Sequence, residues 1–204
     1  MKVLVVVDMQ NDFIDGSLGT DEAKAIVDKV EKRVADALAA EDTIVLFTRD
    51  THQQNYLQTQ EGKILPVEHC IKGTLGWEIV EPLMQYVDSG RVAVLDKPNF
   101  GSIKLPETLH TMLTAEIGAT FSDFDVWEEP KKSKKLEEIE LCGLCTDVCV
   151  ISNALILKAA FPDIPVKVQE ELCAGVTPQT HKNALEAMKM CQVEVIDIDS
   201  KETI

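Results

Sequence analysis

Near its start the chain reads VLVVVD over residues 3–8, an unbroken run of valine and leucine that ends in an acid. Apolar runs that do not alternate with polar residues are typical of strands buried on both faces, as in a parallel sheet. Shorter or weaker runs of the same kind recur at residues 43–47, 91–95, 139–142, 166–168 and 193–198. Together they predict a mostly parallel central sheet of about six strands.

Helical patterns lie between these runs. In residues 21–40 apolar side chains recur every three or four positions, which is typical of a helix that buries one face. Residues 77–86, 147–160 and 177–190 have similar patterns, and the last begins with a threonine cap followed by proline. Because strands and helices alternate, we expect a doubly wound, three-layer α/β/α fold.

The composition limits the class of protein. The 204 residues, of which 45% are hydrophobic, favour one globular domain over residues 1–204, and the lysine-rich residues 119–135 predict a surface insertion of hairpin or loop form. The net charge of −15 repels nucleic acid and anionic lipid, so we expect neither as a partner. The first apolar run is too short for a signal peptide, and none approaches the ~20 residues that span a bilayer. We therefore expect a cytoplasmic protein.

Six cysteines are present, and Cys142 and Cys145 form a C-x-x-C motif. This motif leaves open a redox or binding protein that is not an enzyme, although no second C-x-x-C accompanies it. In a cytoplasmic protein we expect reduced thiols, with Cys142, Cys173 and Cys191 as small buried core residues.

Residues able to carry chemistry follow three of the predicted strands. Asp8 ends the first run, Lys97 follows the third, and the fourth leads into a helix start that contains Cys149. Ligands of open α/β sheets bind beyond the carboxyl ends of the strands, so we expect these three side chains to converge. A helix start and a nearby ammonium both favour a thiolate, and Asp8 can accept the thiol proton. The N–H groups of Cys145 and Cys149 are then available to an oxyanion.

Each of these residues also has an ordinary structural explanation. An acid after a strand is often a cap, a lysine usually lies at the surface, and a cysteine at a helix start is often packed in the core. Their joint position at three strand ends is what favours a catalytic site.

Three motifs carry a resemblance to a known family: VDMQNDF at residues 7–13, DK at 96–97 with FGS at 100–102, and CGLCTDVCV at 142–150. Over nearly the whole chain they resemble the isochorismatase-like cysteine hydrolases, most closely the nicotinamidases. In that family an acid, a lysine and a cysteine form the catalytic triad, which here implies Asp8, Lys97 and Cys149. The resemblance also implies a cis peptide bond between Leu144 and Cys145.

The resemblance to nicotinamidases further implies a metal site, because they carry a metal that binds the pyridine nitrogen, whereas many relatives lack one. The stretch RDTH at residues 49–52 supplies an acid and a histidine, and PVEHCIKGT at 66–74 resembles the stretch that gives the last histidine. The remaining ligand varies between histidine and glutamate. The implied ligands are Asp50, His52, Glu61 and His69. Zinc suits two imidazoles and two carboxylates, and iron or manganese can occupy the same set.

The same resemblance implies hydrolysis of nicotinamide to nicotinate and ammonia through a thioester, a step of NAD salvage, in a pocket walled by Phe13, Leu65 and Phe100. Two departures bear on that wall: Val148 stands where some relatives have histidine or tyrosine, and Leu65-Pro66 stands where many have an aromatic residue before prolines. These departures leave open which aromatic residues form the wall. A homo-oligomer is also left open.

Two other enzymes are alternatives. One is a metal-independent amidohydrolase of the same family that acts on another small amide or carbamoyl compound. The other cleaves isochorismate without a cysteine nucleophile, and the presence of Cys149 counts against it. His110 and His181 are expected to be ordinary surface or helix residues.

Overall fold

The structure is a computed structural model that describes residues 1–115 and 136–197. Its centre is a six-stranded sheet in which every pair of neighbours is parallel, in the order β3-β2-β1-β4-β5-β6. The strands are β1 Lys2–Val7, β2 Thr43–Asp50, β3 Ala93–Lys97, β4 Glu138–Leu144, β5 Val166–Ala174 and β6 Glu194–Ile196. The predicted parallel α/β/α fold is confirmed.

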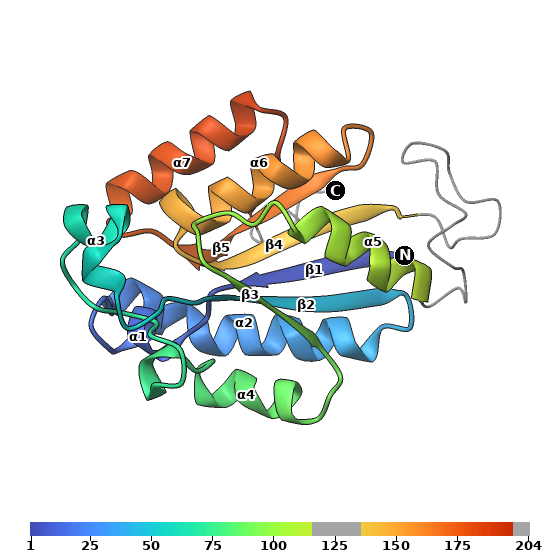
Figure 1. Ribbon diagram of the computed structural model, residues 1–204. Helices are drawn as coiled ribbons and strands as arrows, with labels where there is room; N and C mark the ends of the chain where they lie inside the picture. The colour runs from blue at the N-terminus through green and yellow to red at the C-terminus, as the bar shows by residue number, and fades with distance from the viewer. Residues whose placement is uncertain (116–135, 198–204) are drawn as a thin grey trace.

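Helices cover both faces of the sheet (Figure 1). On one face lie α2 Asp21–Ala39 and α4 Glu81–Asp88, and on the other lie α5 Leu105–Ala115, α6 Ile151–Ala160 and α7 Pro178–Met190. The short helices α1 Asn11–Ile14 and α3 Gln60–Ile64 lie near the carboxyl ends of the strands. This end of the sheet is therefore the one surrounded by loops and short helices.

Local sequence explains why the long helices begin where they do. The Thr20 side chain accepts a hydrogen bond from the Ala23 N–H and so caps α2, whose buried face includes Val30 and Val34. Thr177 caps α7 in the same way, with Pro178 at the first helical position, as the sequence predicted.

Three sequence predictions are wrong in detail. The helix predicted at residues 77–86 begins only at Glu81, because Val80 is extended and a separate 3₁₀ turn, Leu75–Trp77, precedes it. Helix α5 was not predicted. Cys191 is exposed rather than buried, because it caps the end of α7 at the surface. The expected core positions of Cys142 and Cys173 are confirmed.

Two predicted regions fall outside the described residues: the insertion at residues 119–135 and the end of the run at 193–198. Among the residues that are described, no helix is both long and apolar enough to cross a bilayer.

The strand order reverses between β1 and β4, and the backbone there is unusual. Asp8, directly after β1, has φ +47°, and Gly143 in β4 has φ +111°. A Cβ atom at Gly143 would lie 2.2 Å from the Val7 carbonyl oxygen, so no other residue fits. The cis peptide bond implied at Leu144–Cys145 is present. In doubly wound sheets this reversal is where ligands bind.

Candidate active site

The three predicted catalytic residues meet at the β1–β4 reversal. Lys97 Nζ lies 2.6 Å from Asp8 Oδ2 and 3.5 Å from Cys149 Sγ. Asp8 and Lys97 are fully buried, and Cys149 is 4% exposed. The lysine therefore lies between the carboxylate and the thiol, and these three residues are called the triad below.

Neighbouring groups hold the triad in place. The Thr48 hydroxyl donates to Asp8 Oδ1 at 2.7 Å, and Lys97 Nζ donates to the Asn99 carbonyl at 3.1 Å. Lys97 Nζ also lies 3.5 Å from Asp50 Oδ1, so the ammonium faces two carboxylates. The charges of Asp8 and Lys97 are thus compensated inside the protein.

Burial and charge set the protonation of the acid and the lysine. Burial raises the pKa of Asp8, the Lys97 ammonium opposes this, and the charge of Asp50 adds to it, so the pKa lies above its usual value. Burial alone would lower the pKa of Lys97, but the charges of Asp8, Cys149 and Asp50 raise it well above the usual value. Lys97 is therefore an ammonium.

The Cys149 thiol behaves differently from what the sequence suggested. Burial raises its pKa well above the usual value; Lys97 lowers it, but Asp8 and Asp50 raise it further. Desolvation thus outweighs the helix start and the ammonium that favour a thiolate. In the resting protein Cys149 is a neutral thiol, which needs a base before it can act as a nucleophile.

Cys149 lies in a single π-helical turn, Thr146–Val150, that runs directly into α6. The Val150 N–H donates to the Cys145 carbonyl at 3.0 Å, across the wider π spacing. Such turns are frequent at functional sites. Within the described chain the Cys145 N–H has no backbone acceptor, which leaves it available to a ligand oxygen.

Side chains of this π turn also hold the β5–α7 connection. Both carboxylate oxygens of Asp147 lie 3.1 Å from the Val176 N–H, and the Thr146 hydroxyl is 2.8 Å from Nδ1 of His181. His181, expected to be an ordinary helix residue, is half-buried and contacts the nucleophile turn.

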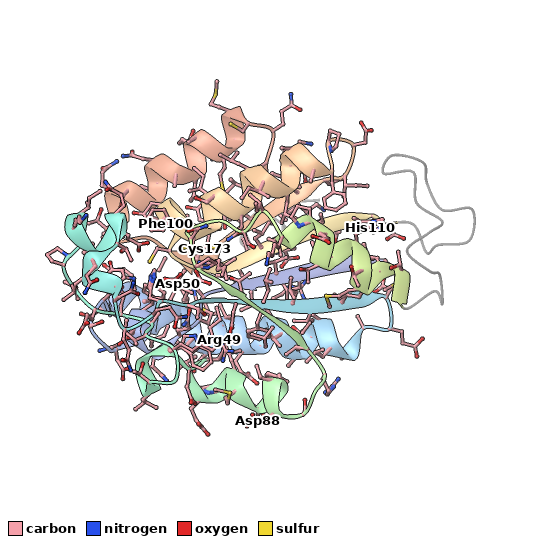
Figure 2. The ribbon with its side chains drawn as sticks, in the orientation of Figure 1. Arg49, Asp50, Asp88, Phe100, His110 and Cys173 are labelled. Carbon is pink, nitrogen blue, oxygen red and sulfur yellow. The ribbon has the colours of Figure 1, made fainter. Side chains whose placement is uncertain are left out.

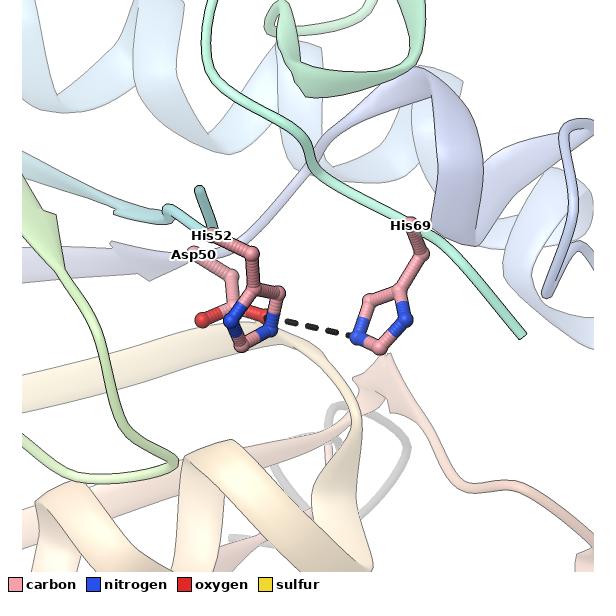
Figure 3. Close-up of side chains that lie close together, drawn as sticks. All are labelled: Asp50, His52 and His69. Atoms are coloured by element: carbon pink, nitrogen blue, oxygen red, sulfur yellow. Dashed lines mark ion pairs between the residues drawn. The ribbon is translucent and has the colours of Figure 1, made fainter. Parts of the chain in front are cut away.

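The four predicted metal ligands converge beside the triad. Asp50 and His52 lie at and just beyond the end of β2, while Glu61 is in α3 and His69 is on the chain that follows it. Figure 3 shows Asp50 and the two imidazoles pointing into one space. His52 Nε2 lies 3.0 Å from Asp50 Oδ2 and 3.6 Å from Glu61 Oε1. His69 Nε2 lies 3.7 Å and 3.8 Å from the same two oxygens.

These four residues are called the donor cluster below: Asp50, His52 and His69 each bring a ligand atom within 4.8 Å of the others, and Glu61 is the candidate for a fourth ligand. Bonds of about 2.0–2.2 Å place tetrahedral ligand atoms about 3.3–3.6 Å apart, close to the distances found. His69 Nδ1 must donate to the Val67 carbonyl at 2.8 Å, since a carbonyl only accepts, and this leaves Nε2 with a free lone pair. His52 Nε2 is buried, and its contacts within the described residues are the nearby carboxylates of Asp50 and Glu61, which are candidate ligands themselves. The residues present therefore fit a divalent metal.

Sequence reasoning assigned no role to two residues that support the donor cluster. Gln10 holds the Asp50 backbone at both ends: its Nε2 donates to the Asp50 carbonyl at 2.8 Å, and its Oε1 accepts from the Asp50 N–H at 2.7 Å. Tyr56 is fully buried, its ring centroid 4.6 Å from that of His52 and 4.9 Å from that of His69. Gln10 lies within the first motif, but nothing local distinguishes Tyr56.

One cavity of about 240 Å³ connects the triad to the donor cluster. Its lining includes Cys145 and Cys149, the donors Asp50, Glu61 and His69, and the three predicted wall residues, Phe13, Leu65 and Phe100. Leu18, Val148 and Val176 complete its apolar surface. This volume lies below the roughly 300–1,000 Å³ of pockets that hold drug-sized ligands, so the cavity suits a molecule of about one ring.

Figure 2 shows Asp50 and Phe100 towards the end of the sheet that carries this cavity, and His110 far from both on α5. Desolvation lowers the pKa of His110, which lies well away from the triad. This position agrees with the prediction that His110 is an ordinary surface or helix residue.

A family model for the isochorismatase domain matches residues 2–200. The chain belongs to the isochorismatase family. It is 24% identical to the nicotinamidase of Saccharomyces cerevisiae, over 97% of this chain and 100% of the relative. It is also 24% identical to the nicotinamidase/pyrazinamidase of Mycobacterium tuberculosis, over 96% of this chain and 98% of the relative. The chain is therefore a hydrolase, either a nicotinamidase or a related isochorismatase-like amidohydrolase.

A solved structure supports the same fold. The pyrazinamidase of Pyrococcus horikoshii in complex with zinc matches with a TM-score of 0.71 at 22% identity, over 97% of this chain and 99% of that one. At this identity the likeness concerns the fold, whereas the donor cluster described above is a property of this chain's own residues.

Proposed function

We propose that this protein hydrolyses nicotinamide to nicotinate and ammonia, with Asp8, Lys97 and Cys149 as its catalytic residues. The single observation that carries the proposal is the small, mainly apolar cavity that is lined both by the nucleophile Cys149 and by residues of the donor cluster. The sequence relatives named as nicotinamidases agree with it. We place the reaction in NAD salvage in the cytoplasm.

Asp8 begins the reaction by accepting the proton of the Cys149 thiol. Its raised pKa makes it a better base than an ordinary aspartate, and Lys97, in contact with both groups, stabilises the thiolate that forms. The thiolate attacks the amide carbon. The oxyanion of the tetrahedral intermediate accepts hydrogen bonds from the N–H groups of Cys145 and Cys149.

Collapse of this intermediate releases ammonia and leaves a thioester on Cys149. Asp8 returns its proton to the leaving nitrogen, so the carboxylate is again free to act as a base. A water molecule then gives its proton to Asp8 and attacks the thioester carbon. Nicotinate leaves, and the proton held by Asp8 returns to the Cys149 thiol.

The other lining residues select and orient the substrate. Phe13, Leu65 and Phe100 supply the apolar surface against which the ring packs. Asp50, His52, Glu61 and His69 would hold one divalent metal, for which we propose zinc. When bound, such a metal supplies a Lewis acid for the ring nitrogen. A metal-independent relative would have no use for this donor cluster, and the cluster therefore favours nicotinamide over other small amides.

Ammonia release from nicotinamide by the purified protein, measured together with metal content, tests the proposal. We expect turnover, about one bound metal per chain, and no turnover by the Cys149→Ala variant. Ammonia release from other small amides but not from nicotinamide, by protein that binds no metal, would establish the alternative amidohydrolase instead.

A further inference from the structure

Asn153 is a fully buried polar side chain in the first turn of α6, directly behind the nucleophile turn. Asparagine has a low helix propensity, and burying an amide costs free energy unless it forms hydrogen bonds. Its position therefore calls for partners that compensate both costs.

Three backbone groups form hydrogen bonds with the Asn153 side chain. Asn153 Nδ2 donates to the Cys149 carbonyl at 2.9 Å and to the Phe100 carbonyl at 3.3 Å. Asn153 Oδ1 accepts from the Ser102 N–H at 3.0 Å. Because carbonyls only accept and an amide N–H only donates, this network fixes the orientation of the side-chain amide. One side chain thus joins the nucleophile's backbone to residues 100–102.

Residues 99–102 form the segment that follows Lys97, and the segment lies directly against α6. A Cβ atom at Gly101 would lie 2.7 Å from the Ile156 side chain and 3.0 Å from that of Ser152. Its first member, Asn99, accepts the hydrogen bond of the Lys97 ammonium, and Phe100 lines the substrate cavity.

These contacts close a ring around the reacting thiol. From Cys149 the ring runs through Asn153 to Phe100, on to Asn99, and from its carbonyl to Lys97 Nζ, which lies 3.5 Å from Cys149 Sγ. Any shift of this segment relative to α6 would therefore change both the Lys97–Cys149 distance and the position of Phe100.

From this ring we infer that Asn153 is a positioning residue that fixes Lys97 and Phe100 relative to Cys149. The inference rests on the proposed function for its kinetic readout. Displacements of about 1 Å in a catalytic group can cost about 100-fold in rate, so loss of this connection is expected to be visible in turnover.

The Asn153→Thr variant isolates the connection. A threonine hydroxyl can donate to the carbonyl four residues earlier, here Cys149, but is too short to reach residues 100–102 as well. We expect kcat on nicotinamide to fall about tenfold or more and KM to rise. The melting temperature should fall by a few degrees, because the Ser102 N–H loses its partner, but unfolding should stay cooperative. Asn183→Thr, the same change at an exposed position of α7, is the matched control and should leave both constants unchanged.

Hydrogen exchange at the Ser102 amide reports the connection independently of turnover. It should speed up in Asn153→Thr, with the strands of the sheet still protected. Unchanged kcat and KM, with or without faster exchange, would overturn the inference. If activity is lost and hydrogen exchange is faster throughout the sheet, Asn153 stabilises the fold as a whole. That result would also overturn the inference that it is a positioning residue.

If the wild type releases no ammonia from nicotinamide, the proposed function fails, yet the inference can still be tested. Alkylation of Cys149 by iodoacetamide then replaces turnover, since it requires only the thiol and its neighbours. If the alkylation rate of Cys149 in Asn153→Thr differs from the wild-type rate by more than about threefold, the positioning role of Asn153 is supported. An equal alkylation rate contradicts it.

Discussion

Asp8 and Lys97 of the triad lie at the ends of strands and Cys149 lies in the turn after β4, whereas three of the four donor residues, His52, Glu61 and His69, lie on the long connection between β2 and β3. Asp8 and Lys97 are fully buried and paired with each other. Glu61, by contrast, belongs to the five-residue helix α3, and its side chain is 20% exposed. The acid and the lysine are thus held by the sheet, the nucleophile by the turn that follows β4, and the proposed substrate-orienting groups mostly by a connection.

This difference suggests how one fold can serve several substrates. Parallel strands hold their carboxyl ends at fixed positions, so a triad placed there keeps its geometry when connections change. Connections tolerate changes of sequence and length far better than strands do. Changes to the triad should therefore abolish chemistry, whereas changes on the connection should alter metal binding and substrate preference.

The largest effect is expected at the nucleophile. Cys149→Ala removes the thiol that forms the proposed thioester, and we expect kcat on nicotinamide to fall by at least about 10⁴-fold. A thermal unfolding curve should show a folded protein, because the change removes one buried sulfur atom. Substantial turnover by this variant would rule out Cys149 as the nucleophile.

The Asp8→Asn variant should separate hydrolysis from thiol reactivity. We expect kcat to fall about 10²–10⁴-fold, because the general base is gone. The charge of Asp8 raises the pKa of Cys149, so its removal should lower that pKa and speed alkylation of Cys149 by iodoacetamide at neutral pH. The pH profile of alkylation should move to lower pH. Slower alkylation, or a profile moved to higher pH, would contradict these electrostatics.

Metal binding can be tested at His69, which lies on the connection between β2 and β3. His69→Ala removes one ligand, so metal affinity should fall by more than about tenfold, measured as metal content and by competition with a chelator. Iodoacetamide should still alkylate Cys149, since the triad is untouched. His110→Ala, far away on α5, is the control and should bind metal normally. Unchanged metal content in His69→Ala would remove this residue from the site.

The smallest effect is expected at the cavity wall. Phe100 lines the cavity but is 47% exposed, so Phe100→Ala should cost about 1 kcal/mol of substrate binding and raise KM about fivefold. Ile103→Ala in the same connection, where the side chain is 86% exposed, should leave KM unchanged. Equal KM values for the two variants would show that the ring does not pack against Phe100.

The two regions also differ in how far the sequence predicts them. Apolar runs mark strands, and the strand-end rule alone brings Asp8, Lys97 and Cys149 to one edge. No periodic pattern places Glu61 or His69, which were assigned only by resemblance to nicotinamidases. A connection without repeating apolar positions has no local signal for where its side chains will lie.

The sequence alone also does not predict properties that depend on tertiary contacts. The sequence indicated a helix start and an ammonium that favour a thiolate at Cys149, with Asp8 to accept the proton. It could not show that full burial raises the pKa of the thiol, because burial is set by the whole fold. Asn153 and Tyr56 act through groups distant in sequence, at residues 100–102 and at the two imidazoles. An asparagine or a tyrosine in a sequence does not by itself indicate contacts of this kind.

The hydrogen bonds of Gln10 have a consequence for redesign. The Gln10 amide forms hydrogen bonds with both backbone groups of Asp50, and its Nε2 also donates to the Trp77 carbonyl at 2.8 Å. The end of β2, which carries Asp50, is therefore joined to the segment after β1 and to the turn Leu75–Trp77. An engineer who wants a different cation in this cavity should therefore randomise α3, where Glu61 can be exchanged without disturbing these hydrogen bonds.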